Sequence, residues 1–232
     1  MGEHTVKSYG DNLSEIANDI VRMGGVVEAQ VQDAITAIVR RDTSLAQSVV
    51  VKDARADEAH RDIERRATRI LALRQPMAND LREVISAFKA AGELERVGDL
   101  AKSVAKRSLV LNQSDPIQLT RSIERMGRIA MDLLKEVLDA YSQRDVAKAL
   151  SVWHRDEELD AYYNSLFREL LTYMMEDPRT ITPCAHLLFV AKNIERIGDH
   201  CTNIAETVHY LITGEEIGRD RPKSDESTHT DQ

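Results

Sequence analysis

The chain has 232 residues, of which 30% are charged and only 4% are aromatic, and its formal net charge is −8. This length is enough to bury a core, and the small numbers of glycine (10) and proline (5) are typical of long amphipathic helices. Three classes are excluded: no apolar stretch is long enough to span a membrane, two cysteines cannot form a disulfide framework, and the negative charge argues against nucleic acid as the main ligand. The first residues, MGEHTVKSYG, lack the apolar segment of a secretory signal, so we expect a cytoplasmic protein.

The predicted helices follow from apolar residues spaced three or four apart, beginning with a stripe from Leu13 to Ile38. Five further stripes of the same period follow in chain order, over residues 45–70, 94–104, 123–137, 152–173 and 194–208. Between them stand residues that cap or end a helix, namely Asp42, Pro76, Asp115-Pro116, Arg144-Asp145 and Pro178. The sequence therefore predicts six helices of about 25–35 residues, and short loops make successive helices antiparallel neighbours.

The second half of the chain repeats the first. Met23-Gly24 and Arg41-Asp42 recur 103 residues later as Met126-Gly127 and Arg144-Asp145. The motif LERVGD at residues 94–99 recurs 100 residues later as IERIGD at 194–199. Because the offset is constant within helices and changes at a loop, the pattern indicates a duplicated three-helix unit.

The predicted fold class is therefore all-α, with two tandem antiparallel three-helix bundles related by internal duplication. We place an N-terminal lead at residues 1–10, the first repeat at 11–113 and the second repeat at 114–213. The remaining residues, 214–232, are rich in charged and polar side chains (RDRPKSDESTHTDQ), which predicts a disordered tail.

Acidic residues stand in pairs at spacing i, i+4, which places both carboxylates of a pair on one helix face. The eight residues are Asp53, Asp57, Glu95, Asp99, Asp156, Asp160, Glu195 and Asp199. If the helices pair as hairpins around Pro76 and around Pro178, each repeat brings four carboxylates to the same level near mid-helix. Like charges at such a distance repel and raise one another's pKa unless a cation is present, which favours a metal site in each repeat. Oxygen ligands suit Mg²⁺, Ca²⁺, Mn²⁺ or iron.

Two features have alternative readings. The alternative reading of the acids places them on a solvated helix face, neutralised by Arg96 and Arg196. Gly98 and Gly198 each cost a helix interior about 1 kcal/mol relative to Ala, which fits either a close approach at a site or tight helix packing.

Other polar residues give weaker signals. His60, in the sequence Asp57-x-x-His60, has Tyr163 as its counterpart in the second repeat, so the pattern is not duplicated and we expect no metal ligand there. The basic run Arg61, Arg65, Arg66, Arg69 and Arg74 is either an ordinary solvated helix face or a patch for an acidic partner.

The twin motifs, extended as Asn193 to His200 in the second repeat, resemble the signature of the PhoU family of phosphate-specific transport system accessory proteins. The segments 74–76 (RQP), 80–82 (DLR) and 173–177 (YMMED) also resemble this family, and the similarity runs from about residue 8 to 213. It implies two three-helix bundles, frequent homodimers, and multinuclear iron or zinc bound at the acidic motifs in some members; Mg or Mn is also compatible with oxygen ligands.

The resemblance also implies a function. The expected protein is not an enzyme but a cytoplasmic negative regulator of the phosphate regulon, docking on the ATPase subunit of the phosphate ABC transporter and on the sensor histidine kinase. It would meet the membrane only through these partners, and Arg96 and Arg196 are candidate partner-binding residues. Two alternatives are a ferritin-like carboxylate-bridged metal enzyme and a metal-free helical scaffold. Lys102, where the second repeat has Thr202, departs from the family pattern and predicts weaker metal binding in the first repeat.

Overall fold

The computed structural model describes residues 2–114 and 120–218, and every regular element in these ranges is helical. The elements are α1 (Gly2–Arg40), α2 (Thr43–Lys52), α3 (Ala54–Arg74), α4 (Asn79–Leu111), α5 (Thr120–Gln143), α6 (Val146–Glu176), the short 3₁₀ helix η1 (Pro178–Thr180) and α7 (Ile181–Thr213). The predicted all-α class is confirmed. None of the described helices is both long enough and apolar enough to cross a membrane.

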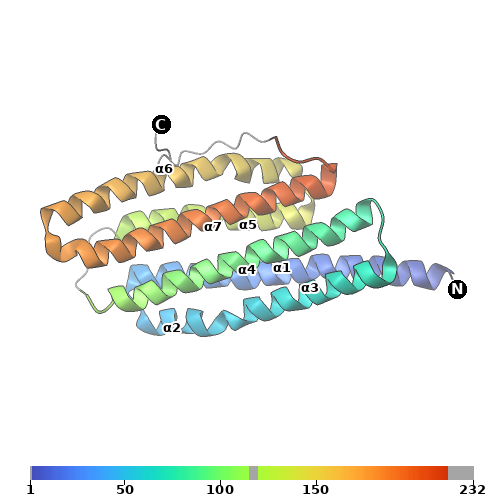
Figure 1. Ribbon diagram of the computed structural model, residues 1–232, viewed down its shortest axis with the longest axis horizontal. Helices are drawn as coiled ribbons and strands as arrows, with labels where there is room; N and C mark the ends of the chain where they lie inside the picture. Colours follow the sequence, from blue (N-terminus) through green and yellow to red (C-terminus); the bar gives the residue numbers. More distant parts are fainter. Residues whose placement is uncertain (1, 115–119, 219–232) are drawn as a thin grey trace.

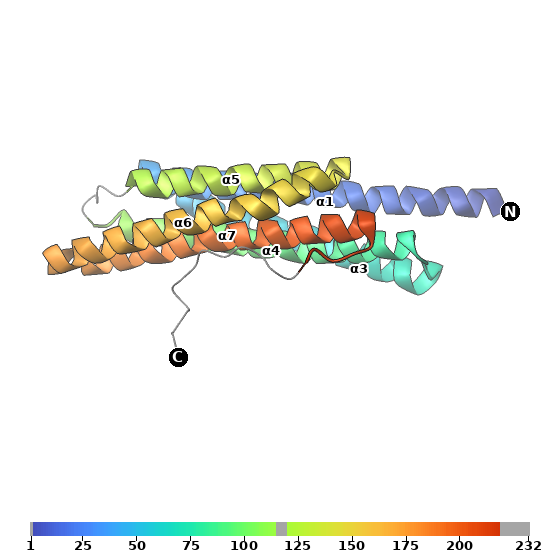
Figure 2. The same cartoon turned by 90° about the horizontal axis from the view of Figure 1, so that it is seen from above.

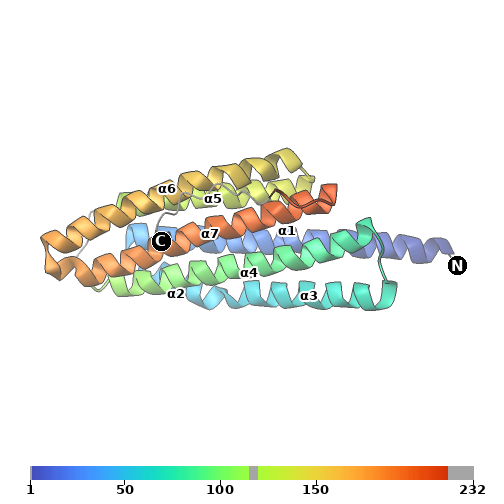
Figure 3. The ribbon, with the colours of Figure 1, turned by 45° about the horizontal axis from the view of Figure 1, so that its top comes forward.

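The helices form an elongated bundle in which the two repeats lie side by side (Figures 1 and 3). The first repeat consists of α1, the rod formed by α2 and α3, and α4; the second consists of α5, α6 and α7. The central pair, α4 and α7, joins the repeats, and α1 also contacts α5. Figure 2 shows α1 extending beyond the other helices toward the N-terminus. The tandem repeat of helical bundles is therefore confirmed.

The duplicated Arg-Asp motif ends one helix and starts the next in both repeats. Arg41 and Arg144 adopt positive φ angles of 53° and 54°, which turn the chain between helices. Asp42 and Asp145 then cap α2 and α6, each accepting a hydrogen bond from the backbone amide three residues later, at 2.9 and 3.1 Å. The Arg144 guanidinium also bridges both carboxylate oxygens of the buried Glu83 on α4, at 2.7 Å each. The duplicated motif thus fixes where the second helix of each repeat begins.

The rod expected as a single second helix is interrupted in the first repeat. α2 ends at Lys52 and α3 begins at Ala54, whereas α6 runs unbroken through the counterpart Asp156. At the interruption the amide of Ala56 bonds the carbonyl of Asp53 at 2.9 Å, a tight three-residue step in place of the usual four. The six predicted helices therefore appear as six rods, one of which is broken at an acidic residue.

The ends of the chain differ partly from the expectation. The segment 1–10, expected as a separate lead, belongs to α1 from Gly2 onward. Of the tail, α7 ends at Thr213 with Gly214 in the left-handed conformation (φ 79°). Residues 219–232, predicted to be disordered, lie outside the described residues.

Two glycines allow close contact between the repeats. A Cβ added at Gly24 on α1 would overlap the side chain of Leu138 on α5, and one added at Gly127 on α5 would lie 2.7 Å from two carbons of Ile35 on α1. These contacts are reciprocal, so the duplicated Met-Gly motif marks two places where α1 and α5 pack closely.

Candidate metal centres

The second repeat brings its four acids together between α6 and α7. Asp156, Asp160 and Glu195 are each at least 97% buried, and Asp199 is half-buried. The charges of Asp160 and Asp199 both act on Glu195 and raise the pKa of its carboxyl group. The antiparallel pairing around Pro178 therefore sets these carboxylates at one level, as the hairpin geometry requires.

Glu195 is the most perturbed acid of this cluster. Burial, reinforced by Asp199 and Asp160, raises its pKa to about 7, although Lys192 opposes the shift. Its Oε1 accepts a hydrogen bond from Lys192 Nζ at 2.9 Å, while Oε2 is buried and accepts none from the described residues. A buried carboxylate oxygen of this kind favours either a bound proton or a bound cation.

Gly198 allows α7 to approach α6 closely at this level. A Cβ on Gly198 would overlap Oδ1 of Asp156 and would lie 2.6 Å from Cδ2 of Leu159. The second-repeat glycine is therefore required by helix packing, and the packed group is one of the acids. Tight packing therefore accounts for Gly198, and its part in a metal site stays a prediction.

In the first repeat a lysine lies between two of the four acids. The buried Asp53 accepts hydrogen bonds from Gln30 Nε2 at 2.8 Å and from Lys102 Nζ through its other oxygen. Lys102 Nζ also lies 3.4 Å from Oδ1 of Asp99, whose side chain is 55% exposed. Because an ammonium group already neutralises two of the four acids, this cluster is less suited to a metal ion than that of the second repeat.

The other two acids of the first repeat lie beside a histidine. Burial raises the pKa of Glu95, Asp99 and Asp57 raise it further, and His60 acts in the opposite direction. His60 Nε2 lies 3.5 Å from Glu64. The charge of His60 thus acts on the acidic cluster. The sequence pattern Asp57-x-x-His60 predicted no metal ligand, because the second repeat does not duplicate it.

The donor chemistry fits a cation, but the side chains do not form a closed coordination shell. Within residues 2–114 and 120–218, no three His, Cys, Asp or Glu side chains are placed so that they hold a metal ion. Coordination at the second repeat would therefore require movement of side chains. The ligands available are carboxylate oxygens, which suit hard cations.

Sequence reasoning missed two residues that contact the acids. Lys192 stands three residues before Glu195, a spacing that brings side chains together on a helix, so its pairing was open to prediction. Gln30 is 5% exposed, and nothing in a single sequence marks this polar residue within an apolar helix face. Arg96 and Arg196, the candidate partner-binding residues, are both exposed.

Comparison with known proteins gives the same family throughout the folded chain. The PhoU domain matches residues 20–108 and again residues 123–208. The chain is 58% identical over 226 residues to the phosphate-specific transport system accessory protein PhoU homolog of Caulobacter vibrioides, covering 97% of this chain and 98% of the relative. A homolog from Rhizobium meliloti is 51% identical, covering 96% of this chain and 94% of the relative.

Two solved structures share the architecture. PhoU from Pseudomonas aeruginosa superposes with a TM-score of 0.87 at 39% identity, covering 89% of this chain and 100% of that chain. The phosphate transport system regulatory protein PhoU from Streptococcus pneumoniae gives a TM-score of 0.84 at 30% identity, covering 90% of this chain and 99% of that chain.

Proposed function

Because this chain belongs to the PhoU family, we propose that it is a cytoplasmic regulatory adaptor that represses the phosphate-starvation response and modulates phosphate uptake. Its partners in this proposal are the ATPase subunit of the phosphate ABC transporter and the sensor histidine kinase of the phosphate regulon. The supporting observation is the 58% identity, over nearly the full length of both chains, to a relative named as an accessory protein of phosphate-specific transport.

The adaptor function requires surfaces for other proteins, and the end of α3 offers one. Arg69 and Arg74 are exposed there, beside the exposed apolar side chains of Leu73 (67%) and Phe88 (44%). Exposed apolar groups flanked by cations suit a partner with an acidic, apolar surface. We assign this face, formed by the C-terminal part of α3 and the start of α4, to partner docking.

The main test is genetic. Deleting the gene should derepress phosphate-scavenging genes in phosphate-rich medium, and Arg69→Glu should reproduce the deletion without lowering the melting temperature. Arg121→Glu, which reverses an exposed arginine on α5, is the matched control and should behave like wild type. Unchanged reporter expression in the deletion strain would contradict the adaptor function. A derepressed Arg121→Glu strain would contradict the choice of docking face.

We also propose that the cluster of the second repeat binds a metal ion through Glu195, Asp199, Asp156 and Asp160. The bound ion would supply positive charge that holds these carboxylates ionised and ties α6 to α7. The identity of the ion is taken from the family, where iron and zinc occur, and from the oxygen donors, which also suit Mn²⁺ or Mg²⁺. The four carboxylates would hold the ion, and Glu195 offers Oε2, which accepts no hydrogen bond from the described residues while Oε1 accepts one from Lys192.

Metal binding is tested by thermal unfolding of chelator-treated protein with each cation added in turn. A ligand that binds only the folded state stabilises it by about 2.7 kcal/mol at a hundredfold excess over its Kd. The double variant Glu195→Ala/Asp199→Asn should lose this response, and the matched variant Glu95→Ala/Asp99→Asn should retain most of it. Identical melting with and without every cation would reject the metal site and favour a metal-free scaffold.

The ferritin-like enzyme is the remaining alternative. Such a site uses Glu-x-x-His pairs in both halves, whereas the counterpart of His60 is Tyr163. Oxygen consumption by the protein with Fe²⁺ separates the two functions, because an adaptor would consume no more oxygen than the Glu195→Ala/Asp199→Asn variant.

A further inference from the structure

A groove of about 600 Å³ runs along the surface of the first repeat between α3 and α4. Its lining residues on α3 follow one another in pairs, one helical turn apart, and are Glu64, Arg65, Thr68, Arg69, Ala72 and Leu73. Phe88 lines the groove from α4. At a rise of 1.5 Å per residue the stripe from Glu64 to Leu73 is roughly 14 Å long. Figures 1 and 3 show α3 at the outer edge of the bundle, beside α4 and away from the second repeat.

Apolar side chains of the groove are open to solvent on both helices. Leu73 is 67% exposed and Phe88 is 44% exposed. Ala72 is also exposed, and Met77, in the turn that joins α3 to α4, is 80% exposed. Single exposed apolar residues are ordinary, but several of them gathered at one hollow are typical of a surface that another molecule covers.

The C-terminal half of α3 adds positive charge to this surface. From Arg65 to Arg74 the sequence holds four arginines and no Asp or Glu, in a chain whose net charge is −8. Arg65 and Arg66 are paired with acids of α3 and α1. Arg69 and Arg74 form no ion pair with any residue that the structure describes. Two exposed guanidinium groups are therefore free to pair with carboxylates of another molecule.

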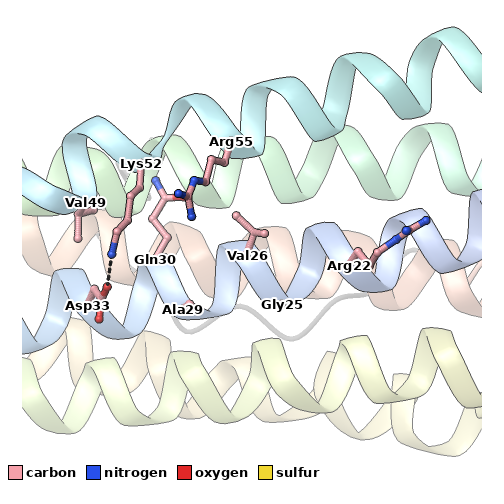
Figure 4. A pocket seen from close by; sticks show the side chains of 9 residues that line it. All are labelled: Arg22, Gly25, Val26, Ala29, Gln30, Asp33, Val49, Lys52 and Arg55. Atoms are coloured by element: carbon pink, nitrogen blue, oxygen red, sulfur yellow. Dashed lines mark ion pairs between the residues drawn. The ribbon is translucent and has the colours of Figure 1, made fainter.

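A second hollow in the first repeat has a different charge balance. It lies between α1 and the junction of α2 and α3, and three cations line it (Figure 4). Lys52 Nζ lies 3.7 Å from Asp33, and Arg22 is paired with Asp19, so two of these three cations are already neutralised within the chain. The groove at the end of α3 differs from it, because its unpaired charge adjoins exposed apolar side chains.

The second repeat lacks this combination at the equivalent helix. The counterparts lie 103 residues later, and residues 168–177 contain one arginine and three acids. Thr172 stands in place of Arg69, and Glu176 stands in place of Leu73. The two repeats share one fold, so the basic and apolar groove is a property of the first repeat that the fold itself does not require.

From these observations we propose that the groove binds an acidic amphipathic helix of a partner protein, an inference that rests on the adaptor function proposed above. A helix suits the site better than an extended strand, because both walls are helices and present no sheet edge to which a strand could bond. Apolar residues spaced three or four apart on the partner helix cover Leu73 and Phe88, and carboxylates beside them pair with Arg69. A flat anionic bilayer fits less well, because the site is hollow and Glu64 lines it.

The first test locates the bound element by crosslinking. A photoreactive amino acid replaces the exposed Thr68 inside the groove of the full-length protein. The protein is then mixed with the purified ATPase subunit of the phosphate ABC transporter or with the cytoplasmic region of the sensor kinase. We expect crosslinks to a helix that carries at least two acids beside apolar residues spaced three or four apart. Crosslinks to a strand, a loop or a basic segment, or a complex that forms without any crosslink, would overturn the proposal.

Substitutions then separate the apolar contact from the charged one. Leu73→Asp and Arg69→Glu should each weaken binding of the crosslinked partner at least about tenfold. Exchanging an acid of the crosslinked helix for arginine should restore the binding of Arg69→Glu. Met175→Asp, at the exposed end of α6, and Arg121→Glu, on α5, are the matched controls and should bind as wild type does. Melting temperatures show that each variant is folded, and unchanged binding of folded Leu73→Asp and Arg69→Glu would overturn the proposal.

The groove and the adaptor function fail in different ways. If gene deletion derepresses the phosphate-scavenging genes while Leu73→Asp still binds both partners and represses normally, the adaptor function stands and the groove proposal is overturned. If the deletion has no effect, or wild type binds neither partner, both are overturned. Sedimentation with vesicles of phosphatidylglycerol and phosphatidylethanolamine in equal amounts is the last arm. Vesicle binding that Leu73→Asp abolishes, with binding of both protein partners intact, would identify a membrane surface as the occupant and overturn the helix.

Discussion

Gly198 and Asp156 are in such close contact that a single methyl group on the glycine would overlap the carboxylate oxygen Oδ1 of the aspartate. Their counterparts in the first repeat are more loosely packed, because a Cβ on Gly98 would lie 3.8 Å from Oδ1 of Asp53 and no closer than 3.4 Å to any neighbour outside its own helix. The same sequence motif therefore closes tightly around one acid and leaves ordinary van der Waals distance around the other.

This difference predicts that the same substitution affects the free energy of unfolding differently in the two repeats. Gly198→Ala should lower the free energy of unfolding by about 1–3 kcal/mol, because the methyl group forces Asp156 or Leu159 out of place. Gly98→Ala should be neutral or should raise it by up to about 1 kcal/mol, because alanine favours the helix and meets only ordinary contacts. Urea unfolding of the two variants beside wild type measures both effects. Equal destabilisation in both repeats would contradict the close contact at Gly198.

Much of this arrangement follows from the sequence. The caps at Asp42 and Asp145, and the levels at which Asp57 meets Glu95 and Asp160 meets Glu195, required only helical periodicity and antiparallel pairing. These features occur in both repeats, so the pattern in one repeat supports the helix pairing predicted for the other.

The features that the sequence does not predict are contacts between side chains of different helices. The break at Asp53, its bond to Gln30 on α1 and the contact between His200 and Glu93 all join residues far apart in the chain. Periodicity says which face of a helix is buried, but it does not say which polar side chain on a neighbouring helix reaches that face.

Glu195 predicts a pH dependence of stability for the metal-free protein. Its pKa in the folded state is about 7, against an ordinary value of 4.5, so the folded protein holds this proton more tightly than the unfolded chain. The stabilising effect of the proton is fully present below the ordinary pKa and is lost as pH rises through 7.

Replacing Glu195 by Gln, which mimics the protonated acid, should therefore change stability in a pH-dependent way. At pH values above 7 the variant should be more stable than wild type by up to about 3 kcal/mol, and below the ordinary pKa the two should be equal. Chemical unfolding in the presence of a chelator, over a series of pH values, measures this difference. A difference that does not change with pH would show that Glu195 stays ionised throughout.

Glu93 on α4 joins the two repeats, and it predicts a pH dependence of stability opposite to that of Glu195. Its Oε2 lies 2.7 Å from Nδ1 of His200 and accepts a hydrogen bond from Asn203 at 2.9 Å, both on α7. Burial alone would raise the pKa of Glu93, but these two hydrogen bonds lower it below the ordinary value. A depressed folded-state pKa means that the stabilisation is present above the ordinary pKa and is lost as pH falls through the folded pKa.

Glu93→Gln should accordingly reduce the unfolding free energy near neutral pH by about 1.5–3 kcal/mol, the usual range for hydrogen bonds to a charged group. Its effect should shrink in acid, where the wild-type carboxylate is protonated as well. Glu58→Gln, which changes an exposed acid on α3, serves as the control and should alter stability little at any pH. If the cost of Glu93→Gln stayed constant into strong acid, the charge of Glu93 would not be what joins the repeats.

A substitution at Lys102 makes the acidic cluster of the first repeat more like that of the second. Its ammonium group binds Asp53 and approaches Asp99, while the corresponding position of the second repeat holds Thr202, a fully buried residue that donates its hydroxyl to the carbonyl of Asp199 at 2.7 Å. Removing the lysine leaves the buried Asp53 with Gln30 as its remaining donor. Lys102→Thr should therefore destabilise the metal-free protein by about 1–3 kcal/mol, because a buried carboxylate loses its cation.

A metal ion should reverse that loss if the acids of the first repeat can bind one. We expect the melting temperature of Lys102→Thr to rise more on addition of Mn²⁺ or Zn²⁺ than that of wild type, because the ion replaces the ammonium group between Asp53 and Asp99. Lys106→Thr, a substitution one helical turn further along α4, controls for loss of a positive charge and should respond as wild type does. The measurement is the melting temperature in chelator against that in excess metal for all three proteins. A Lys102→Thr variant that is destabilised and gains nothing from any cation would show that the first cluster is a lysine-bridged structural contact and that metal binding, where it occurs, belongs to the second repeat.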